Sequence, residues 1–506
     1  MKKLKIYFTS DMHGFVYPTD YTNNEKKPIG MLNVINSFTK DENTLIIDGG
    51  DTIQGSPFRT FLSNKEFNIH PISKVINAGK YDFVTLGNHD FNYGFNNLKS
   101  YLENINAECI CANVKDKTGS INIKEYAIKT MKNGLKVAIV GVTTDFIKLW
   151  EQPENLKNFF IGDTFLNVKR VCEEVKKKVD ILVGVYHGGF EKDLKSHKSL
   201  SNTKENLAYK MCKELDFDIL LTGHQHMEIQ GENLYGTYIV QTPKNGQKYA
   251  ELNLEYDERI IKIDSKLVVP EINSSIDIYD ELMPIQEKVE KWLDSVVGHL
   301  DIDLKPKAHI DMAMEGSHLA NFINMVQLEI SNADISCTSI ANSIKGFNKD
   351  VTVRDIVSTY VYPNTLKVLK VTGEVLKMAL NRCCEYFSCD GENVVVSDEF
   401  LKPKAKHYNY DYFSNIQYGY KLNKECNKIT LDYVRFKGID VKDEEEFTLV
   451  MSNYRASGAG GYEFYTKCEV IKEIQVEMTE MLINYFNRYI NVVVDKEKYI
   501  NFIDSK

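Results

Sequence analysis

Short runs rich in Ile, Val and Leu recur through the first half of the chain, and most of them end in a polar loop that contains glycine. The intervals between the runs have helical lengths, and in 166–179 the residues Val168, Val171, Cys172 and Val175 fall on one helical face. Alternation of this kind predicts an α/β fold of layered sheets with helices packed outside them. The predicted strands are 5–9, 45–48, 83–86, 136–142, 181–186 and 219–222.

The helical intervals disappear near residue 237. Residues 249–256 and 260–269 alternate in the manner of paired antiparallel strands, and a polar joint follows at 270–275. Apolar residues from Ile285 to Val296 then recur at helical spacing, which predicts an amphipathic helix that ends near Gly298. This helix marks a boundary between two domains.

From about residue 308 the pattern is a mixture of helices and strands, typical of an α+β domain. We predict a first domain at 1–269, a helical connector at 270–307 and a second domain at 308–506. The predicted helices of the second domain are 317–330, 353–359, 373–385 and 469–489, and its strands include 365–371 and 446–452.

Composition narrows the function classes. The 506 residues are 43% hydrophobic and carry a net charge of −9, which disfavours duplex nucleic acid or an anionic membrane surface as the main partner. No apolar run reaches the roughly 18–20 residues that span a bilayer, and the N-terminus enters a strand at once, so we expect a cytoplasmic protein. The ten cysteines show no regular spacing and are expected to be reduced.

Side chains suited to metal binding follow the ends of the predicted strands. They occur in Asp11-Met12-His13, Gly50-Asp51, Gly87-Asn88-His89-Asp90, His187-Gly188-Gly189 and Gly223-His224-Gln225-His226, with a less informative loop at 143–145. Each alone is more often a helix cap or an ordinary hydrogen-bonding residue. Strand ends converge on one crevice in a layered α/β fold, however, so these side chains should face one another. Asp, His and Asn suit Mn, Zn, Fe, Co or Ni better than calcium, and the set exceeds the needs of one ion. We therefore expect two divalent ions.

In this order the motifs resemble those of the calcineurin-like metallophosphoesterases, over about residues 6–226. The resemblance implies a β-sandwich flanked by helices, with Asp51 shared between two ions. It also implies that His89 stabilises the transferring phosphoryl group and assists the leaving oxygen. The nucleophile would be water activated by the two ions, so no Ser or Cys nucleophile is required. By this resemblance the first ion is held by Asp11, His13, Asp51 and His226, and the second by Asp51, Asn88, His187 and His224.

The second half resembles the C-terminal domain of the 5′-nucleotidases, which clamps a nucleobase between two aromatic rings. The resemblance assigns the clamp to Tyr410 and Tyr454 and places Arg455 and Gly458 at the substrate. A packed strand-end turn is the alternative for the motif around Tyr454, and an aromatic β-edge is the alternative for the cluster at 408–413 that contains Tyr410. Asn92 and Tyr93, the run 361–366 and the Asn-Tyr-Arg-Ala motif resemble the 2′,3′-cyclic-nucleotide 2′-phosphodiesterase/3′-nucleotidase branch.

Two departures from the 5′-nucleotidase pattern bear on the substrate. Asn92 stands where those enzymes pair the catalytic His with Asp, and Gly460 stands where they carry a ribose-binding Asp. A carboxylate near a 3′-phosphate would repel it, so its absence fits cyclic or 3′-substrates. Asn92 is thereby predicted as the catalytic partner of His89.

The sequence thus predicts a dinuclear-metal phosphohydrolase that acts on a small nucleotide. We expect opening of 2′,3′-cyclic nucleotides followed by removal of the 3′-phosphate, with relative motion of the domains about the connector. The alternatives are a 5′-nucleotidase, a nucleotide-sugar hydrolase, a metal-dependent nuclease, which the acidic charge disfavours, and a catalytically idle nucleotide sensor.

Overall fold

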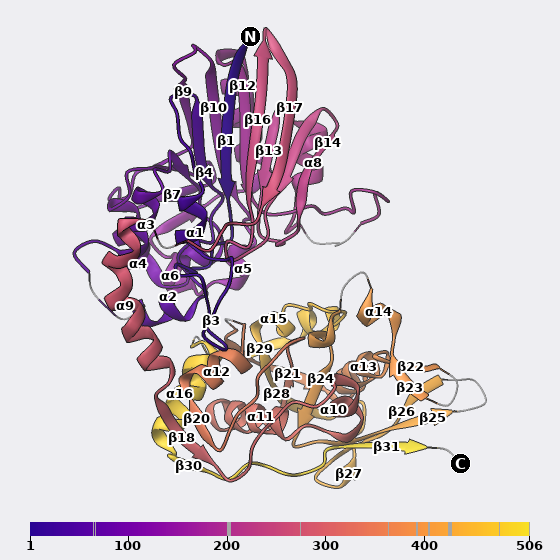
Figure 1. Ribbon diagram of the computed structural model, residues 1–506. Coiled ribbons are helices and arrows are strands. Elements are labelled where there is room, and N and C mark those ends of the chain that lie inside the picture. The colour runs from indigo at the N-terminus through magenta and orange to yellow at the C-terminus, as the bar shows by residue number, and fades with distance from the viewer. Residues whose placement is uncertain are drawn as a thin grey trace. The chain divides into compact units, whose positions relative to one another are not determined.

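The structure is a computed structural model that describes residues 1–63, 65, 67–199, 204–273, 275–362, 364–390, 393–402, 405–423, 428–474 and 476–504 (Figure 1). The chain divides into two compact units, Met1–Glu290 and Lys291–Lys506. The division falls inside helix α9 (Asp277–Leu293), within the segment predicted as the connector. None of the helices that the structure describes combines the length and the apolar character that crossing a bilayer demands.

The first unit is built on two mixed sheets, with strand orders β17-β16-β1-β4-β5-β6-β8 and β14-β15-β13-β12-β10-β9. The first contains β1 (Lys2–Thr9), β4 (Thr44–Asp48), β5 (Phe83–Val84), β6 (Glu108–Ile110), β8 (Ile123–Lys124), β16 (Tyr249–Asp257) and β17 (Arg259–Val268). The second contains β9 (Tyr126–Thr130), β10 (Lys136–Thr143), β12 (Ile181–His187), β13 (Ile219–Thr222), β14 (Ile229–Leu234) and β15 (Thr237–Gln241). Two short pairs are β2 (Thr19–Asp20) with β3 (Glu25–Lys26), and β7 (Val114–Asp116) with β11 (Phe159–Ile161).

Alternate residues of both sheets form one buried core, which confirms the predicted sandwich. Phe8 and Ile47 contribute from the first sheet, and Ile139, Val183 and Leu221 from the second. The strands β1, β4 and β5 are parallel, as are β10, β12 and β13, so the strand ends at one edge of each sheet lie together.

Helices cover the sandwich. Their bounds are α1 (Met31–Asn36), α2 (Pro57–Leu62), α3 (Pro71–Ala78), α4 (Gly94–Glu103), α5 (Ile147–Trp150), α6 (Pro153–Leu156), α7 (Thr164–Val175) and α8 (Ala208–Glu214). Helix α7 begins where the Asp163 side chain accepts a hydrogen bond from the Leu166 amide, and its buried face packs against β10 in a core cluster that also contains residues of β12. Val168 and Val171 belong to this face, as the helical spacing predicts.

The second unit is α+β. Its five-stranded sheet has the order β24 (Asp411–Ser414), β19 (Ile335–Ser339), β28 (Glu446–Ser452), β21 (Leu366–Thr372), β29 (Glu469–Ile474). Smaller sheets comprise β20 (Asp350–Thr352), β18 (Val296–Leu300) and β30 (Asn491–Val492); β27 (Ile439–Asp440), β26 (Lys428–Phe436), β25 (Gln417–Asn423) and β31 (Ile500–Asp504); and β22 (Phe387–Asp390) with β23 (Asn393–Val396). The helices are α10 (His309–Glu315), α11 (His318–Ser331), α12 (Val353–Thr359), α13 (Gly373–Cys384), α14 (Asp398–Leu401), α15 (Asn453–Ala456) and α16 (Met478–Arg488).

Two predicted helices are partly strands. The helix predicted to end near Gly298 ends at Leu293, and Val296–Leu300 forms β18. The helix predicted over 469–489 begins only at Met478, because Glu469–Ile474 pairs with β21 as an edge strand. Val470 and Ile471 are half exposed on that edge, so backbone pairing and not side-chain burial fixes the strand. The apolar spacing over 469–474 therefore predicted a helix where the structure has a strand.

Candidate metal centre and its surroundings

The predicted metal ligands lie in loops at the C-terminal ends of five strands of the first unit. Asp11 and His13 follow β1, Asp51 follows β4, Asn88 follows β5, His187 ends β12, and His224 and His226 follow β13. The positive backbone φ angles at these ligands are 57° at Asp11, 48° at His13, 54° at Asp51, 67° at His224 and 55° at His226. L-residues adopt this region at a cost in free energy, and such residues cluster at functional sites.

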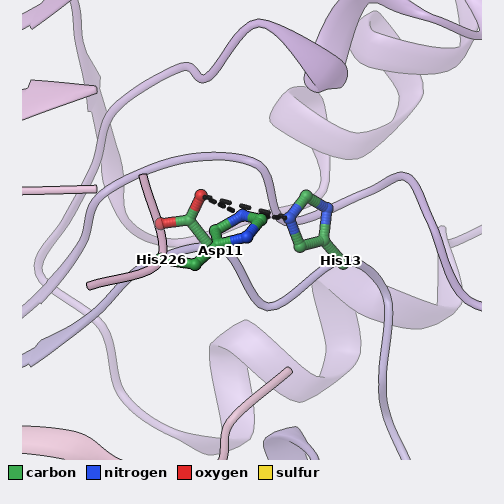
Figure 2. Close-up of side chains that lie close together, drawn as sticks. All are labelled: Asp11, His13 and His226. Atoms are coloured by element: carbon green, nitrogen blue, oxygen red, sulfur yellow. Dashed lines mark hydrogen bonds and ion pairs between the residues drawn. The ribbon is translucent and has the colours of Figure 1, made fainter. Parts of the chain in front are cut away.

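Asp11, His13 and His226 form the first group of possible ligands (Figure 2). The Nε2 atoms of His13 and His226 are 3.1 Å apart, and Asp11 Oδ1 lies 3.3 Å from His226 Nε2 and 4.0 Å from His13 Nε2. The Nδ1 atom of His13 lies 3.1 Å from the Gln54 carbonyl oxygen, which can only accept, so Nδ1 carries the hydrogen. Nε2 is therefore free to bind a cation between these three side chains.

Asp51, His187 and His224 form the second group. His187 is fully buried; its Nδ1 donates to the Gly49 carbonyl oxygen at 2.8 Å, and its Nε2 lies 3.1 Å from Asp51 Oδ2. The other carboxylate oxygen of Asp51 accepts a hydrogen bond from the His89 amide at 2.7 Å. His13 and His187 each have Nδ1 hydrogen-bonded to a backbone carbonyl oxygen. These hydrogen bonds fix the two rings so that each Nε2 faces the other candidate ligands of its group.

Asn88 supplies the test of whether a cation fits. Its Oδ1 atom is buried and has no hydrogen-bond partner among the described residues. A buried carbonyl oxygen without a partner costs roughly 1–3 kcal/mol, and a divalent cation satisfies it. The two clustered groups and this oxygen suit borderline divalent ions, which bind mixed imidazole and oxygen ligands.

The electrostatics of the two groups also fit cations. Burial alone would raise the pKa of Asp51, yet the neighbouring His187 and His89 hold it well below its usual range. Burial alone would lower the pKa of His187, but the charge of Asp51 raises it to about 10. In the metal-free protein a proton on His187 thus compensates the Asp51 carboxylate, and bound cations would take over that compensation.

Asp90, the last residue of the Gly-Asn-His-Asp motif, holds the Asp51 loop by its backbone. Its Oδ2 accepts from the amides of Asp51 and Gly87 at 2.9 and 2.8 Å, and its Oδ1 from those of Thr52 and Ile53 at 2.9 and 3.0 Å. The sequence assigned Asp90 no role, because its four partners are backbone amides, which no sequence motif displays.

The predicted partner of His89 is in place. His89 Nδ1 lies 2.8 Å from Asn92 Oδ1, and the side-chain amide of Asn92 donates to Glu151 Oε2. His89 is close to the metal groups without belonging to either, and its ring lies 5.7 Å from that of His13 between centroids. Sequence reasoning missed two carboxylates of this region, Glu151 and Glu205; the latter lies 2.8 Å from His224 Nε2.

The second unit does not present Tyr410 as a stacking surface. The Tyr410 ring is 1% exposed, packs against Tyr386 and Tyr412, and donates its hydroxyl to the Ala313 carbonyl at 3.1 Å. A base cannot stack on a ring so covered, so the predicted role of Tyr410 does not match its position. Tyr454, by contrast, is 44% exposed.

Arg455 and Gly458 are also structural in this arrangement. Arg455 is 2% exposed, and its guanidinium pairs with Asp411 at 2.8 Å and donates to the Tyr408 carbonyl at 2.9 Å. It therefore anchors the loop that carries Tyr408 instead of facing a ligand. Gly458 has a φ of 87°, and a Cβ atom there would lie 2.9 Å from the Thr466 methyl, so backbone geometry alone accounts for this glycine.

Comparison with known proteins agrees with the two units. Residues 4–228 match the calcineurin-like phosphoesterase family and residues 296–467 match the 5′-nucleotidase C-terminal domain. A Staphylococcus aureus protein whose crystal structure is described as that of a candidate 5′-nucleotidase is 32% identical, with all of both chains covered and a TM-score of 0.85.

Curated relatives are more distant. The trifunctional nucleotide phosphoesterase YfkN of Bacillus subtilis is 25% identical over 95% of this chain, which spans only 38% of that relative. The 2′,3′-cyclic-nucleotide 2′-phosphodiesterase/3′-nucleotidase of Salmonella typhimurium is 23% identical over 90% of this chain and 81% of its own length. With its clustered ligands and both matching domains, the chain belongs to the calcineurin-like phosphoesterases that carry a 5′-nucleotidase C-terminal domain, a family of metal-dependent phosphoric ester hydrolases.

Proposed function

We propose that this protein is a nucleotide phosphohydrolase that opens 2′,3′-cyclic nucleotides to 3′-nucleotides and then removes the 3′-phosphate. The observation that carries the proposal is the convergence of two ligand groups, together with the buried Oδ1 atom of Asn88, which has no hydrogen-bond partner among the described residues. The proposed ligands are Asp11, His13, Asp51 and His226 for one divalent ion, and Asp51, Asn88, His187 and His224 for the other. Mn, Zn, Fe, Co and Ni all suit these donors.

Divalent ions, when bound, would lower the pKa of a water molecule and neutralise the charge of the phosphate. The protein's own part is to hold the reacting groups. His89 is positioned as the donor to the phosphoryl oxygens and to the leaving oxygen. Its Nδ1 atom is engaged by Asn92, which leaves Nε2 as the atom that meets the substrate. His89 is half-buried, so a ligand can reach it.

The second unit would bind the nucleoside. Tyr454 offers an exposed ring for stacking on the base, worth roughly 1–3 kcal/mol. Because Tyr410 is buried, we assign the second ring of the clamp to the half-buried Tyr408, which lies beside Tyr362 with 6.2 Å between ring centroids.

Gly460 favours a cyclic or 3′-phosphorylated ribose. Its φ is +82°, and a Cβ atom would lie 2.5 Å from both Arg455 Nη1 and Asn409 Oδ1. No carboxylate side chain fits at this position, so the ribose edge carries none there to repel a 3′-phosphate. The relatives named as 2′,3′-cyclic-nucleotide 2′-phosphodiesterase/3′-nucleotidase support the same substrate class.

A 5′-nucleotidase is the second candidate, because the Staphylococcus aureus protein described as a candidate 5′-nucleotidase is more similar in sequence, at 32% identity. Assays on 2′,3′-cyclic AMP, 3′-AMP and 5′-AMP, each with Mn²⁺, Zn²⁺ or Co²⁺, separate the two. We expect the first two substrates to give the higher kcat/KM; a preference for 5′-AMP would favour the alternative.

The variant Asp51→Asn tests the shared ligand. We expect loss of metal-dependent turnover with an unchanged fold, whereas Asp264→Asn, the same change at an exposed carboxylate on β17, should behave as the wild type. Full activity of Asp51→Asn would refute the shared site.

A further inference from the structure

A buried carboxylate stands behind the Asn92 side chain. Glu151 follows helix α5 and is 8% exposed, and its Oε2 accepts the hydrogen bond that the Asn92 amide donates. We propose that Glu151 is a positioning residue for His89 and acts through Asn92. The inference rests on the function proposed for the His89 site.

The Glu151 carboxylate is itself held in place. Its Oε1 accepts from the Gln152 amide at 2.7 Å and from Asn155 Nδ2 at 2.9 Å. The same Asn155 nitrogen lies 2.9 Å from the Asn92 carbonyl oxygen, so Asn155 ties the backbone at 92 to the carboxylate. The geometry between Glu151 and Asn92 is therefore fixed from both sides.

His89, Asn92 and Glu151 form a relay of two hydrogen bonds, and the chemistry of these groups fixes which atom donates in each bond. A carboxylate can only accept hydrogen bonds, so the amide of Asn92 must present its NH₂ group to Glu151 and its Oδ1 to His89. That oxygen can only accept, so His89 Nδ1 carries a hydrogen and Nε2 faces the site, where it donates to the substrate when both ring nitrogens are protonated. An amide without Glu151 could rotate by half a turn at little cost and offer His89 a donor instead. Glu151 thus removes the orientation of Asn92 that would set an NH₂ donor against the protonated Nδ1 of His89.

The relay also explains the Asn at position 92. The 5′-nucleotidase pattern pairs this His with Asp directly, whereas the present chain places the carboxylate one residue further from the imidazole, with an amide between. The carboxylate is thereby kept away from the reacting phosphate while it still orients the imidazole.

The first test is Glu151→Gln, with Glu154→Gln as the matched control. Glu154 lies in the neighbouring helix α6, is exposed, and pairs with Lys157. For the nucleotide substrate that the wild type hydrolyses best, we expect Glu151→Gln to lower kcat about tenfold or more with little change in KM, and Glu154→Gln to match the wild type. With p-nitrophenyl phosphate, whose leaving oxygen needs no assistance, Glu151→Gln should lower kcat much less.

The second test moves the carboxylate. Asn92→Asp alone places a half-buried carboxylate in contact with the buried Glu151 carboxylate, which the pair tolerates only if one takes a proton, so its kcat should fall. In the double variant Asn92→Asp/Glu151→Gln a single carboxylate faces His89, and we expect a higher kcat than in either single variant. A merely structural role of Glu151 in its loop predicts that the double variant is no better than Glu151→Gln.

The outcomes separate the inference from the proposed function. An active wild type with an unaffected Glu151→Gln, an equal loss of kcat on p-nitrophenyl phosphate, or a double variant without recovery overturns the role of Glu151 alone. A wild type that hydrolyses no phosphate ester with any of the metals overturns the proposed function and this inference with it.

Discussion

The variant Asp90→Asn probes how the Asp51 loop is held. Asp90 is 2% exposed and accepts four backbone hydrogen bonds, two on each carboxylate oxygen, from Asp51, Thr52, Ile53 and Gly87. An asparagine keeps one oxygen and sets its NH₂ group against two N–H donors. Two of the four bonds are therefore lost, and two buried amides remain without an acceptor.

The magnitude follows from these contacts. A hydrogen bond to a charged group contributes about 1.5–3 kcal/mol, so two lost bonds amount to about 3–6 kcal/mol. Part of this is offset, because burial raises the pKa of Asp90 and Asp51 raises it further, which shows that the ionised form is not fully stabilised. We expect a net loss near the lower end, about 3 kcal/mol, equivalent to about a hundredfold change in an equilibrium constant.

Amide hydrogen exchange measures this directly, because the donors are backbone amides. In the metal-free protein, exchange of a peptide covering Thr52 and Ile53 should accelerate up to about a hundredfold, if these amides exchange through local opening. Mn²⁺ affinity should fall as well, since the same loop carries Asp51.

Asp116→Asn is the control, because Asp116 accepts the amides of Thr118, Ser120 and Ile121 in an exposed turn. It should change exchange only within that turn and leave metal affinity unaltered. Exchange and Mn²⁺ affinity of Asp90→Asn within about twofold of the wild type would refute the argument.

Three further predictions concern single side chains. Asn88→Ala removes the unpartnered oxygen, and calorimetric titration with Mn²⁺ should show one of two sites weakened about tenfold or more; two unchanged sites would exclude Asn88 as a ligand. Burial raises the pKa of Asp48 to about 7, above an unfolded value of about 4, so this carboxyl stabilises the fold at low pH and loses that contribution as pH rises from about 4 to 7. The stability of the wild type relative to Asp48→Asn, from urea unfolding, should thus fall by up to about 4 kcal/mol across this range; a difference independent of pH would contradict it. Arg455→Ala leaves Asp411 buried without its partner and should destabilise the second unit by about 3–5 kcal/mol, which Asp411→Asn in the same chain should partly restore if the pair is the cause.

Much of the fold was predictable because strand and helix signals are local. The strands that lead to Asp11, Asp51 and His187 were identified from short apolar runs, and these candidate ligands stand at or next to the ends of those runs in the chain. Edge strand β29 was not identified, because its half-exposed residues leave no apolar face and pairing with β21 is a long-range choice.

Around the site, some features could be predicted from the sequence and others only from the tertiary structure, and the difference has a plain physical cause. Residue types and their place after strands identified the candidate metal ligands, since these features lie within a few positions of one another. Which atoms meet was decided only by packing: Glu151 reaches Asn92, Arg455 reaches Asp411, and the Tyr410 ring is covered by other aromatic rings. Burial and hydrogen-bond partners depend on residues distant in the chain, and a local pattern contains no information about them.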